Sequence, residues 1–151
     1  MKRIIGLFGL SLFASAPALA VPDAGTTVMG ASGSVHLTPG DLTVNVGGSY
    51  GTFLDGGIFV GGGADLGVLP EIAVAVNGTA QYWMELGDMD AFAGLDLSLP
   101  VMPAFSYTVN VDIGVAKWLS DTFAITVTNT IGGLLEGAIT DDIVIGTMAV
   151  F

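Results

Sequence analysis

The chain has 151 residues, a length that suggests one domain. It is 52% hydrophobic, with a mean hydropathy of +0.76, and it has 3 basic residues against 14 acidic ones. This acidic balance excludes binding to nucleic acids or anionic phosphates by charge attraction. The absence of cysteine excludes a fold held together by disulfides.

Residues 1–20 have the features of a secretion signal. Lys2 and Arg3 form a short cationic start, residues 4–14 are apolar, and Ala18 and Ala20 are the small residues that a signal peptidase accepts. The apolar run is shorter than the roughly 20 residues that a membrane-spanning helix needs. We therefore expect residues 1–20 to be a cleaved signal peptide and residues 21–151 to be the mature domain. In that domain Lys117 is the only basic residue.

Beyond residue 20 the sequence is hydrophobic but contains no apolar run long enough for a membrane helix. Polar residues or glycines interrupt every candidate within a few positions. Inside lipid, only helices and closed β-barrels satisfy all their backbone hydrogen bonds. High hydropathy without such a run therefore predicts a membrane-spanning β-barrel.

The periodicity of the chain supports this interpretation. In residues 42–51, 72–82, 105–114 and 123–131, apolar side chains alternate with polar or small ones. A period of two over about ten residues is typical of a strand with one lipid face and one lumen face. Together with the turn residues between the runs, it predicts eight strands, at 26–37, 41–53, 57–68, 71–85, 90–99, 105–118, 121–134 and 141–151.

The connections between these strands are short and contain Gly, Pro, Asp or Ser, as hairpin turns require. Neighbours in sequence should therefore pair antiparallel. The predicted fold is all-β: an eight-stranded antiparallel up-and-down transmembrane β-barrel. Because the number of strands is even, both termini are expected on the same side of the membrane.

Aromatic residues gather near the second, fourth and sixth turns and near the C-terminus, which share one end of this barrel. Aromatic rings favour the boundary between membrane and water. We therefore expect a ring of membrane-interface aromatics formed by Tyr50, Phe53, Trp83, Trp118, Phe123 and Phe151, with Phe59 and Phe92 nearby. The alternative is a soluble β-sandwich with an aromatic core. It is disfavoured because such a sheet carries charges on its outer face.

Two hairpins and the C-terminus resemble a known family. Residues 49–61 (SYGTFLDGGIFVG) and 115–125 (VAKWLSDTFAI) each combine an aromatic residue, a leucine, a short turn with aspartate and an apolar strand. The chain ends on Phe151 after apolar residues 143–150. In these features it resembles the small outer-membrane β-barrels related to OmpA and OmpX. The resemblance implies a Gram-negative outer-membrane location with the termini in the periplasm. It also implies contact with lipid and recognition of the last strand, through Phe151, by the barrel assembly machinery.

Acidic side chains predicted to face the lumen are the candidate functional residues. By alternation these are Asp65, Glu71, Glu85, Asp96 and Asp112. No basic residue is expected beside them. Lys117 lies an odd number of positions from Asp112, so it has the opposite parity and faces the other side of the strand, and it can extend to water from near a turn. A buried carboxylate without a partner is costly and favours a bound cation. Inward-facing glycines are expected to leave room for water beside the carboxylates, namely Gly47, Gly51, Gly61, Gly63, Gly67, Gly94 and Gly114.

Two functions fit such a barrel. Eight strands enclose a lumen just wide enough for side chains to fill, which favours a non-enzymatic outer-membrane protein with a structural or envelope-interaction role. The acidic lumen keeps open the alternative of a small cation-preferring, porin-like channel. Adhesion through long extracellular loops is disfavoured, because the predicted connections on that side are short.

The only histidine, His36, raises a third hypothesis, a lipid-modifying barrel enzyme. It lies beside Ser34 and Thr38, with Asp41 just beyond the turn. The spacing matches no catalytic motif, and a catalytic triad is defined by geometry rather than by sequence position. The sequence contains no P-loop, dinucleotide-binding, zinc or calcium motif. We therefore predict no enzyme activity, no catalytic residue, and no cofactor or metal ion.

Overall fold

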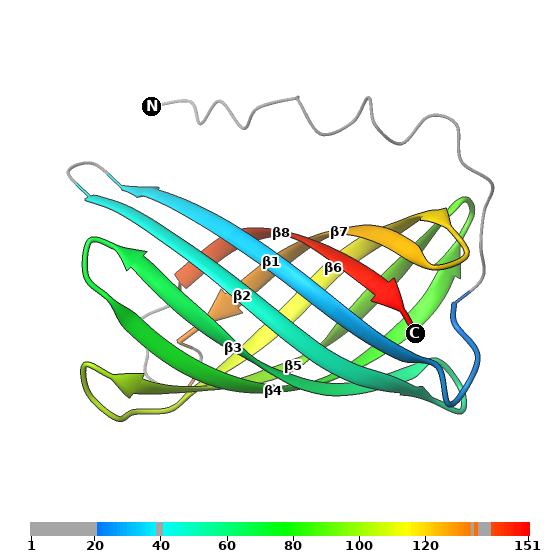
Figure 1. Ribbon diagram of the computed structural model, residues 1–151, viewed down its shortest axis with the longest axis horizontal. Helices are drawn as coiled ribbons and strands as arrows, with labels where there is room; N and C mark the ends of the chain where they lie inside the picture. The colour runs from blue at the N-terminus through cyan, green and yellow to red at the C-terminus, as the bar shows by residue number, and fades with distance from the viewer. Residues whose placement is uncertain (1–20, 39–40, 134, 136–139) are drawn as a thin grey trace.

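Eight antiparallel strands form a closed barrel in the computed structural model, which describes residues 21–38, 41–133, 135 and 140–151. The strands are β1 (Thr27–Thr38), β2 (Asp41–Leu54), β3 (Ile58–Leu69), β4 (Ala73–Leu86), β5 (Met89–Met102), β6 (Thr108–Ser120), β7 (Phe123–Gly132) and β8 (Thr140–Val150). Each strand pairs with its neighbours in sequence, and β8 pairs with β1 to close the barrel (Figure 1). Within these ranges, no helix is long and apolar enough to cross a membrane.

The predicted eight-stranded up-and-down barrel is confirmed, and each strand boundary lies within three residues of its prediction. One difference is in β5, which continues through Pro100 although the sequence predicts a turn there. Pairing between β5 and β6 ends at Ser98 and Thr108. Beyond that point β5 is an edge strand, where a residue without an N–H group is tolerated. The Pro100 carbonyl still accepts a hydrogen bond from the backbone nitrogen of Ser106 at 3.1 Å.

The two ends of the barrel differ in what they carry. Residues 21–26, the C-terminus and the β2–β3, β4–β5 and β6–β7 turns lie at one end, called here the terminal end (Figure 1). There the backbone nitrogen of Gly25 donates to the Phe53 carbonyl at 2.7 Å, and that of Phe53 donates to the Thr26 carbonyl at 2.9 Å. These bonds attach the first described residues to β2. The β3–β4 and β5–β6 connections lie at the opposite end, called here the loop end.

The outer face of the barrel is apolar on every strand. Strand positions that alternate with the interior ones carry large, exposed apolar side chains, among them Met29, Val46, Leu66, Tyr82, Leu95, Ile113, Phe123 and Ile145. Soluble monomers rarely expose so continuous an apolar surface. An outward apolar band of this kind is typical of a barrel surrounded by lipid.

Four aromatic rings fill the interior at the terminal end, and together they are called here the aromatic plug. Phe53, Phe59, Trp83 and Phe92 are each at most 5% exposed. The ring centroid of Phe53 lies 5.2 Å from that of Phe59 and 5.4 Å from that of Trp83. Trp83 in turn stacks on Phe92 at 4.5 Å. The same buried cluster includes Val28 and Ala116, against which Val21, Met148 and Val150 pack.

Glycines on neighbouring strands make the plug possible. Gly51 and Gly61 lie against the Phe59 ring and Gly114 against the Phe92 ring, so closely that a Cβ atom would collide with the ring. The expectation that these glycines leave room for water is therefore wrong, because aromatic rings from adjacent strands occupy that space. Polar side chains occupy the space at the other inward glycines: Asp65 at Gly47, Asn77 at Gly63, Asn45 at Gly67 and Gln81 at Gly94.

Gly114→Ala should destabilise the barrel by about 1–3 kcal/mol, the usual cost of overpacking a filled interior. Its Cβ would lie 2.7 Å from the Val127 carbonyl oxygen and 2.8 Å from Cε2 of Phe92. The measurement is urea unfolding in lipid vesicles, followed by tryptophan fluorescence. Gly78→Ala is the matched control, because its Cβ would approach nothing closer than the Gly61 carbonyl oxygen at 3.9 Å. Equal losses in the two variants would show that ring contact is not what selects glycine at position 114.

Candidate functional site: an acidic cavity above the plug

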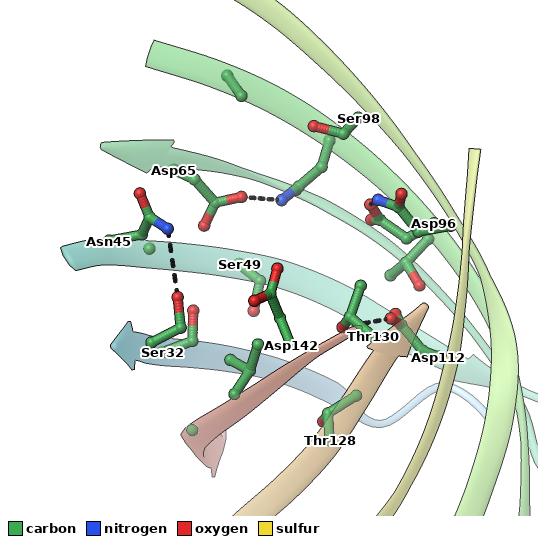
Figure 2. A pocket seen from close by; sticks show the side chains of 18 of the residues that line it. Ser32, Asn45, Ser49, Asp65, Asp96, Ser98, Asp112, Thr128, Thr130 and Asp142 are labelled. Carbon is green, nitrogen blue, oxygen red and sulfur yellow. Dashed lines mark hydrogen bonds between the residues drawn. The ribbon is translucent and has the colours of Figure 1, made fainter. Parts of the chain in front are cut away.

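A cavity of about 440 Å³ lies inside the barrel between the aromatic plug and the loop end. Phe59, Trp83 and Phe92 line it at the plug, and most of the other lining residues are polar or small. Figure 2 shows the carboxylates directed into it from β3, β5, β6 and β8, those of Asp65, Asp96, Asp112 and Asp142. In this view Ser49 lies beside Asp142, and Ser32 lies below Asn45 at the edge of the cavity. This cavity is the candidate functional site.

Three of the predicted lumen acids line this cavity, and each has a neutral hydrogen-bond donor on the next strand. Asn77 Nδ2 donates to Asp65 Oδ2 at 2.6 Å, and Asn110 Nδ2 donates to Asp96 Oδ1 at 3.2 Å. The third bond runs from Thr130 Oγ1 to Asp112 Oδ1 at 2.8 Å. The last two pairs are direct register partners. The expectation of carboxylates without partners is therefore wrong, because neutral amide and hydroxyl groups bond all three of them.

The cavity includes a fourth carboxylate, Asp142, which the sequence analysis does not single out. Asp142 pairs with Thr130 across β7 and β8, and it shares its parity with Val144 and Gly146, which also line the cavity. The alternation of β8 contains this information. The signal is weak because Asp142 lies at the start of the predicted strand 141–151, where the strand overlaps the predicted turn at residues 136–142.

Two predicted lumen acids, Glu71 and Glu85, do not line the cavity. Glu71 precedes β4, which begins at Ala73, so strand alternation does not apply to it, and its side chain is exposed. Glu85 lies on the other side of the plug. It is exposed in a cleft at the terminal rim, together with Asp23 and Asp55. The prediction that both point inward near the ends of their strand fails for Glu71, which lies outside β4. Glu85 keeps the inward parity and is the register partner of Asp90, but it lies on the terminal side of the plug, away from the cavity.

The predicted ring of interface aromatics divides into two groups. Phe53, Trp83 and Trp118 are 0%, 2% and 3% exposed, so the prediction that they face the membrane boundary is wrong. Their parity is that of the lumen residues on the same strands, and the rings pack inside. The other three, Tyr50, Phe123 and Phe151, are exposed, which an interface position requires. That lipid covers them stays a prediction.

Below the plug, at the terminal end, lies a second polar group. Asp90 is 1% exposed, and its Oδ2 accepts a hydrogen bond from Nε1 of Trp118 at 2.8 Å. Asp90 shares its parity with Phe92 and Asp96 and therefore faces the interior. In the sequence Asp90 is the first residue of the predicted strand 90–99, at the edge of a turn, where alternation gives little sign of the face it occupies.

Lys117, expected to extend to water, is instead buried. Its ammonium nitrogen donates to the Asp88 carbonyl at 2.6 Å and to the Asp88 carboxylate at 2.8 Å, so the β4–β5 turn covers it. The hydrogen bond and the charge of Lys117 hold the pKa of the Asp88 carboxyl below its ordinary value. Lys117, the one Lys or Arg in residues 21–151, therefore fixes the β4–β5 turn.

The remaining chemistry predicted from sequence is limited. The side chain of His36 lies outside the described residues, so the enzyme hypothesis gains no geometry. Among the side chains that the structure describes, no group of three or more His, Cys, Asp or Glu is arranged to hold a metal ion. The cavity aspartates are therefore spread over its wall instead of forming one chelating cluster.

No protein-family model matches the chain, and no curated protein matches it either. Solved structures do share its fold. The N-terminal β-barrel domain of OprF from Pseudomonas aeruginosa matches with a TM-score of 0.62 and 14% identity, over 85% of this chain and 98% of that one. Neisserial surface protein A matches with a TM-score of 0.61 and 12% identity, over 85% and 98%. A de novo designed transmembrane β-barrel matches with a TM-score of 0.63 and 15% identity, over 86% and 98%.

The chain therefore has the fold of the small eight-stranded outer-membrane barrels, as its resemblance to the OmpA and OmpX barrels implies. At these identities the likeness concerns the fold alone. What the protein does has to be argued from the residues of its own interior and surface.

The ion pair between Lys117 and Asp88 should make stability depend on acid pH. Because the pKa of Asp88 is lowered in the folded state, its contribution is present above the unfolded value of about 4 and is lost as pH falls through the lower folded value. We expect Asp88→Asn to unfold more easily than the wild type near neutral pH, with the difference vanishing below that value. Urea unfolding at a series of pH values measures it. In a Lys117→Met background Asp88→Asn should have no such effect, and an undiminished effect there would contradict the ion pair.

Proposed function

We propose that this chain is a non-enzymatic outer-membrane protein whose barrel crosses the membrane as a closed structural element, with a role in stabilising or interacting with the envelope. The main support is the aromatic plug, in which four buried rings and their apolar neighbours fill the interior at the terminal end. Eight strands leave an interior only about as wide as the side chains that fill it. An ion crossing the barrel would have to pass through these ring contacts.

Three observations support the membrane location. The outer face carries exposed apolar side chains on every strand. The fold is that of known outer-membrane barrels. Residues 1–20 have the pattern of a cleavable signal peptide, which would deliver residues 21–151 to the periplasm. With the terminal end in the periplasm, the plug closes the periplasmic side and the acidic cavity faces the cell exterior.

The partners in this proposal are the lipids around the barrel and the assembly machinery that inserts it. That machinery would recognise β8 through the terminal Phe151. The Phe151 side chain is 76% exposed, while its backbone nitrogen donates to the Thr27 carbonyl at 3.1 Å. The ring is therefore accessible, although the backbone that carries it is fixed to β1. No nucleic acid and no cofactor belongs to the proposal.

A second candidate function, a small cation-preferring channel, is favoured by the cavity itself. Four aspartates from four strands line it, and the donors that bond three of them are neutral. Neutral donors satisfy oxygen atoms without cancelling their charge, so the cavity should attract cations, most strongly at low ionic strength. Ions can cross the barrel through this cavity only if the plug opens. Whether the plug is closed or open therefore distinguishes the structural role from the channel.

Cells that produce the full chain should contain the protein in the outer-membrane fraction, with Val21 as its first residue. Membrane fractionation followed by N-terminal sequencing or intact mass measurement tests both points. Protein that retains Met1, or that is recovered from the soluble periplasmic fraction, would contradict the proposed export and insertion.

The membrane-extracted protein should be silent in a planar bilayer under a salt gradient. Trp83→Ala removes the ring that contacts Phe53, Phe59 and Phe92, and it should produce discrete steps with a cation-selective reversal potential. Tyr82→Ala is the matched control, since this neighbouring ring is 51% exposed on the outer face. Circular dichroism confirms that each variant keeps its strands, because losing a buried ring costs about 3–5 kcal/mol.

Discrete cation-selective steps from the wild type, lost in Asp96→Asn or Asp112→Asn, would overturn the closed barrel and support the channel. A silent Trp83→Ala variant with intact strands would show that the plug is not what prevents conduction.

A further inference from the structure

Asp90 lies directly against the plug on its terminal-end side. Its register partners are Glu85 on β4 and Ala116 on β6. Ala116 belongs to the same buried cluster as the four rings, and Phe92 of the plug lies two residues further along the same face of β5. Ionisation of Asp90 would therefore place a negative charge at the edge of the buried aromatic cluster.

The hydrogen bonds of Asp90 are incomplete. Its Oδ2 accepts from Trp118 Nε1, but its Oδ1 is buried and has no hydrogen-bond partner among the described residues. An ionised carboxylate with one buried, unbonded oxygen costs free energy that the neutral group does not. No step of the proposed closed-barrel role requires an acid at this position.

We propose that Asp90 is a proton-dependent latch of the aromatic plug. With a proton on its carboxyl group the plug is held closed. When the proton leaves to water at the terminal end, a negative charge remains against the buried cluster and the plug loosens. This goes beyond the proposed function, since a closed structural barrel could hold its plug equally at every pH.

Other charged groups around Asp90 favour this behaviour. Glu85 faces it across β4, Asp88 lies in the adjoining turn, and Lys117 on β6 binds Asp88. Asp23 of the N-terminal segment lies with Glu85 in the cleft at the rim. Asp55 lies in the same cleft. Because Lys117 and Asp88 cancel each other's charge, the groups that remain are acidic, and they add to the repulsion that an ionised Asp90 meets.

The two tryptophans are built-in reporters of this latch. The indole N–H of Trp118 donates to Asp90, whereas that of Trp83, within the plug, donates to Gln81 Oε1 at 3.1 Å. Gln81 does not titrate, but its side chain also hydrogen-bonds the Asp112 carboxyl group, so a Trp83 shift supports the latch only if it is lost in Asp90→Asn. Trp83 stacks on Phe92, and its indole resonance is therefore sensitive to any movement between these rings.

The experiment records indole ¹H–¹⁵N resonances of the ¹⁵N-labelled, membrane-extracted protein in micelles from about pH 4 to about pH 9, a range that spans perturbed carboxyl groups. We expect the Trp118 resonance to shift in one step and the Trp83 resonance to follow with the same midpoint. Both should be flat in Asp90→Asn, whose amide keeps the shape and the acceptor for Trp118. Glu85→Gln, the matched control, should keep the step.

Flat resonances in the wild type, or a step that persists in Asp90→Asn, would overturn the latch. A Trp118 step without a Trp83 step would also overturn it, because Asp90 would then titrate without moving the plug. If Asp90→Asn does not fold, Trp118→Phe serves instead. This variant keeps Asp90 but lacks the N–H donor that favours its ionised form, so its Trp83 step should move to higher pH, and an unmoved step would overturn the latch. These readouts do not depend on conductance, so they can fail while the closed barrel stands.

Discussion

Closure of eight strands into a barrel fixes the volume available to inward-facing side chains, and the rest of this structure depends on that limit. Each strand contributes every second side chain to one narrow interior. Near the terminal end those side chains are aromatic, and they fit only because glycines on adjacent strands contribute none, as Gly51 and Gly61 do beside Phe59 and Gly114 does beside Phe92. Toward the loop end the inward side chains are shorter and polar, and a cavity remains. The boundary between plug and cavity lies where the inward-facing side chains change from aromatic to short and polar.

The cavity and the terminal end compensate negative charge in different ways. In the cavity, Asp65 and Asp112 are bonded by an asparagine and a threonine, which satisfy oxygen atoms but leave the charge in place. At the terminal end, Asp88 meets the ammonium group of Lys117, which cancels its charge and fixes a turn. Because residues 21–151 contain no second basic residue, the cavity keeps its acidic character. The single lysine therefore compensates negative charge at the terminal end, whereas the aspartates of the cavity keep theirs.

Strand alternation made the fold predictable from sequence, because a barrel strand repeats with period two and a turn residue marks each reversal. The same alternation also placed Asp65, Asp96 and Asp112, which the structure brings to one cavity. The predictions fail where residue type and alternation point to different faces. Phe53 shares the face of Asn45 and Ser49, and Trp83 that of Asn77 and Gln81, so alternation predicts the interior for both rings, whereas their aromatic character favours the membrane boundary. Contacts between rings on different strands depend on inter-strand register, which no single strand reveals.

The size of the plug bears on which function the barrel can have. If burying each of the four rings contributes about 1.5–3 kcal/mol, exposing all of them to water costs on the order of 6–12 kcal/mol. Each 1.4 kcal/mol or so is a factor of ten, so an open state would hold less than about one molecule in ten thousand. The carboxylates of the cavity lie on the loop-end side of the rings, outside the buried cluster that sets this population. A charge at the edge of the cluster can alter it, since it changes the energy of the closed state itself. Asp90 occupies that position, with one carboxylate oxygen already without a bond.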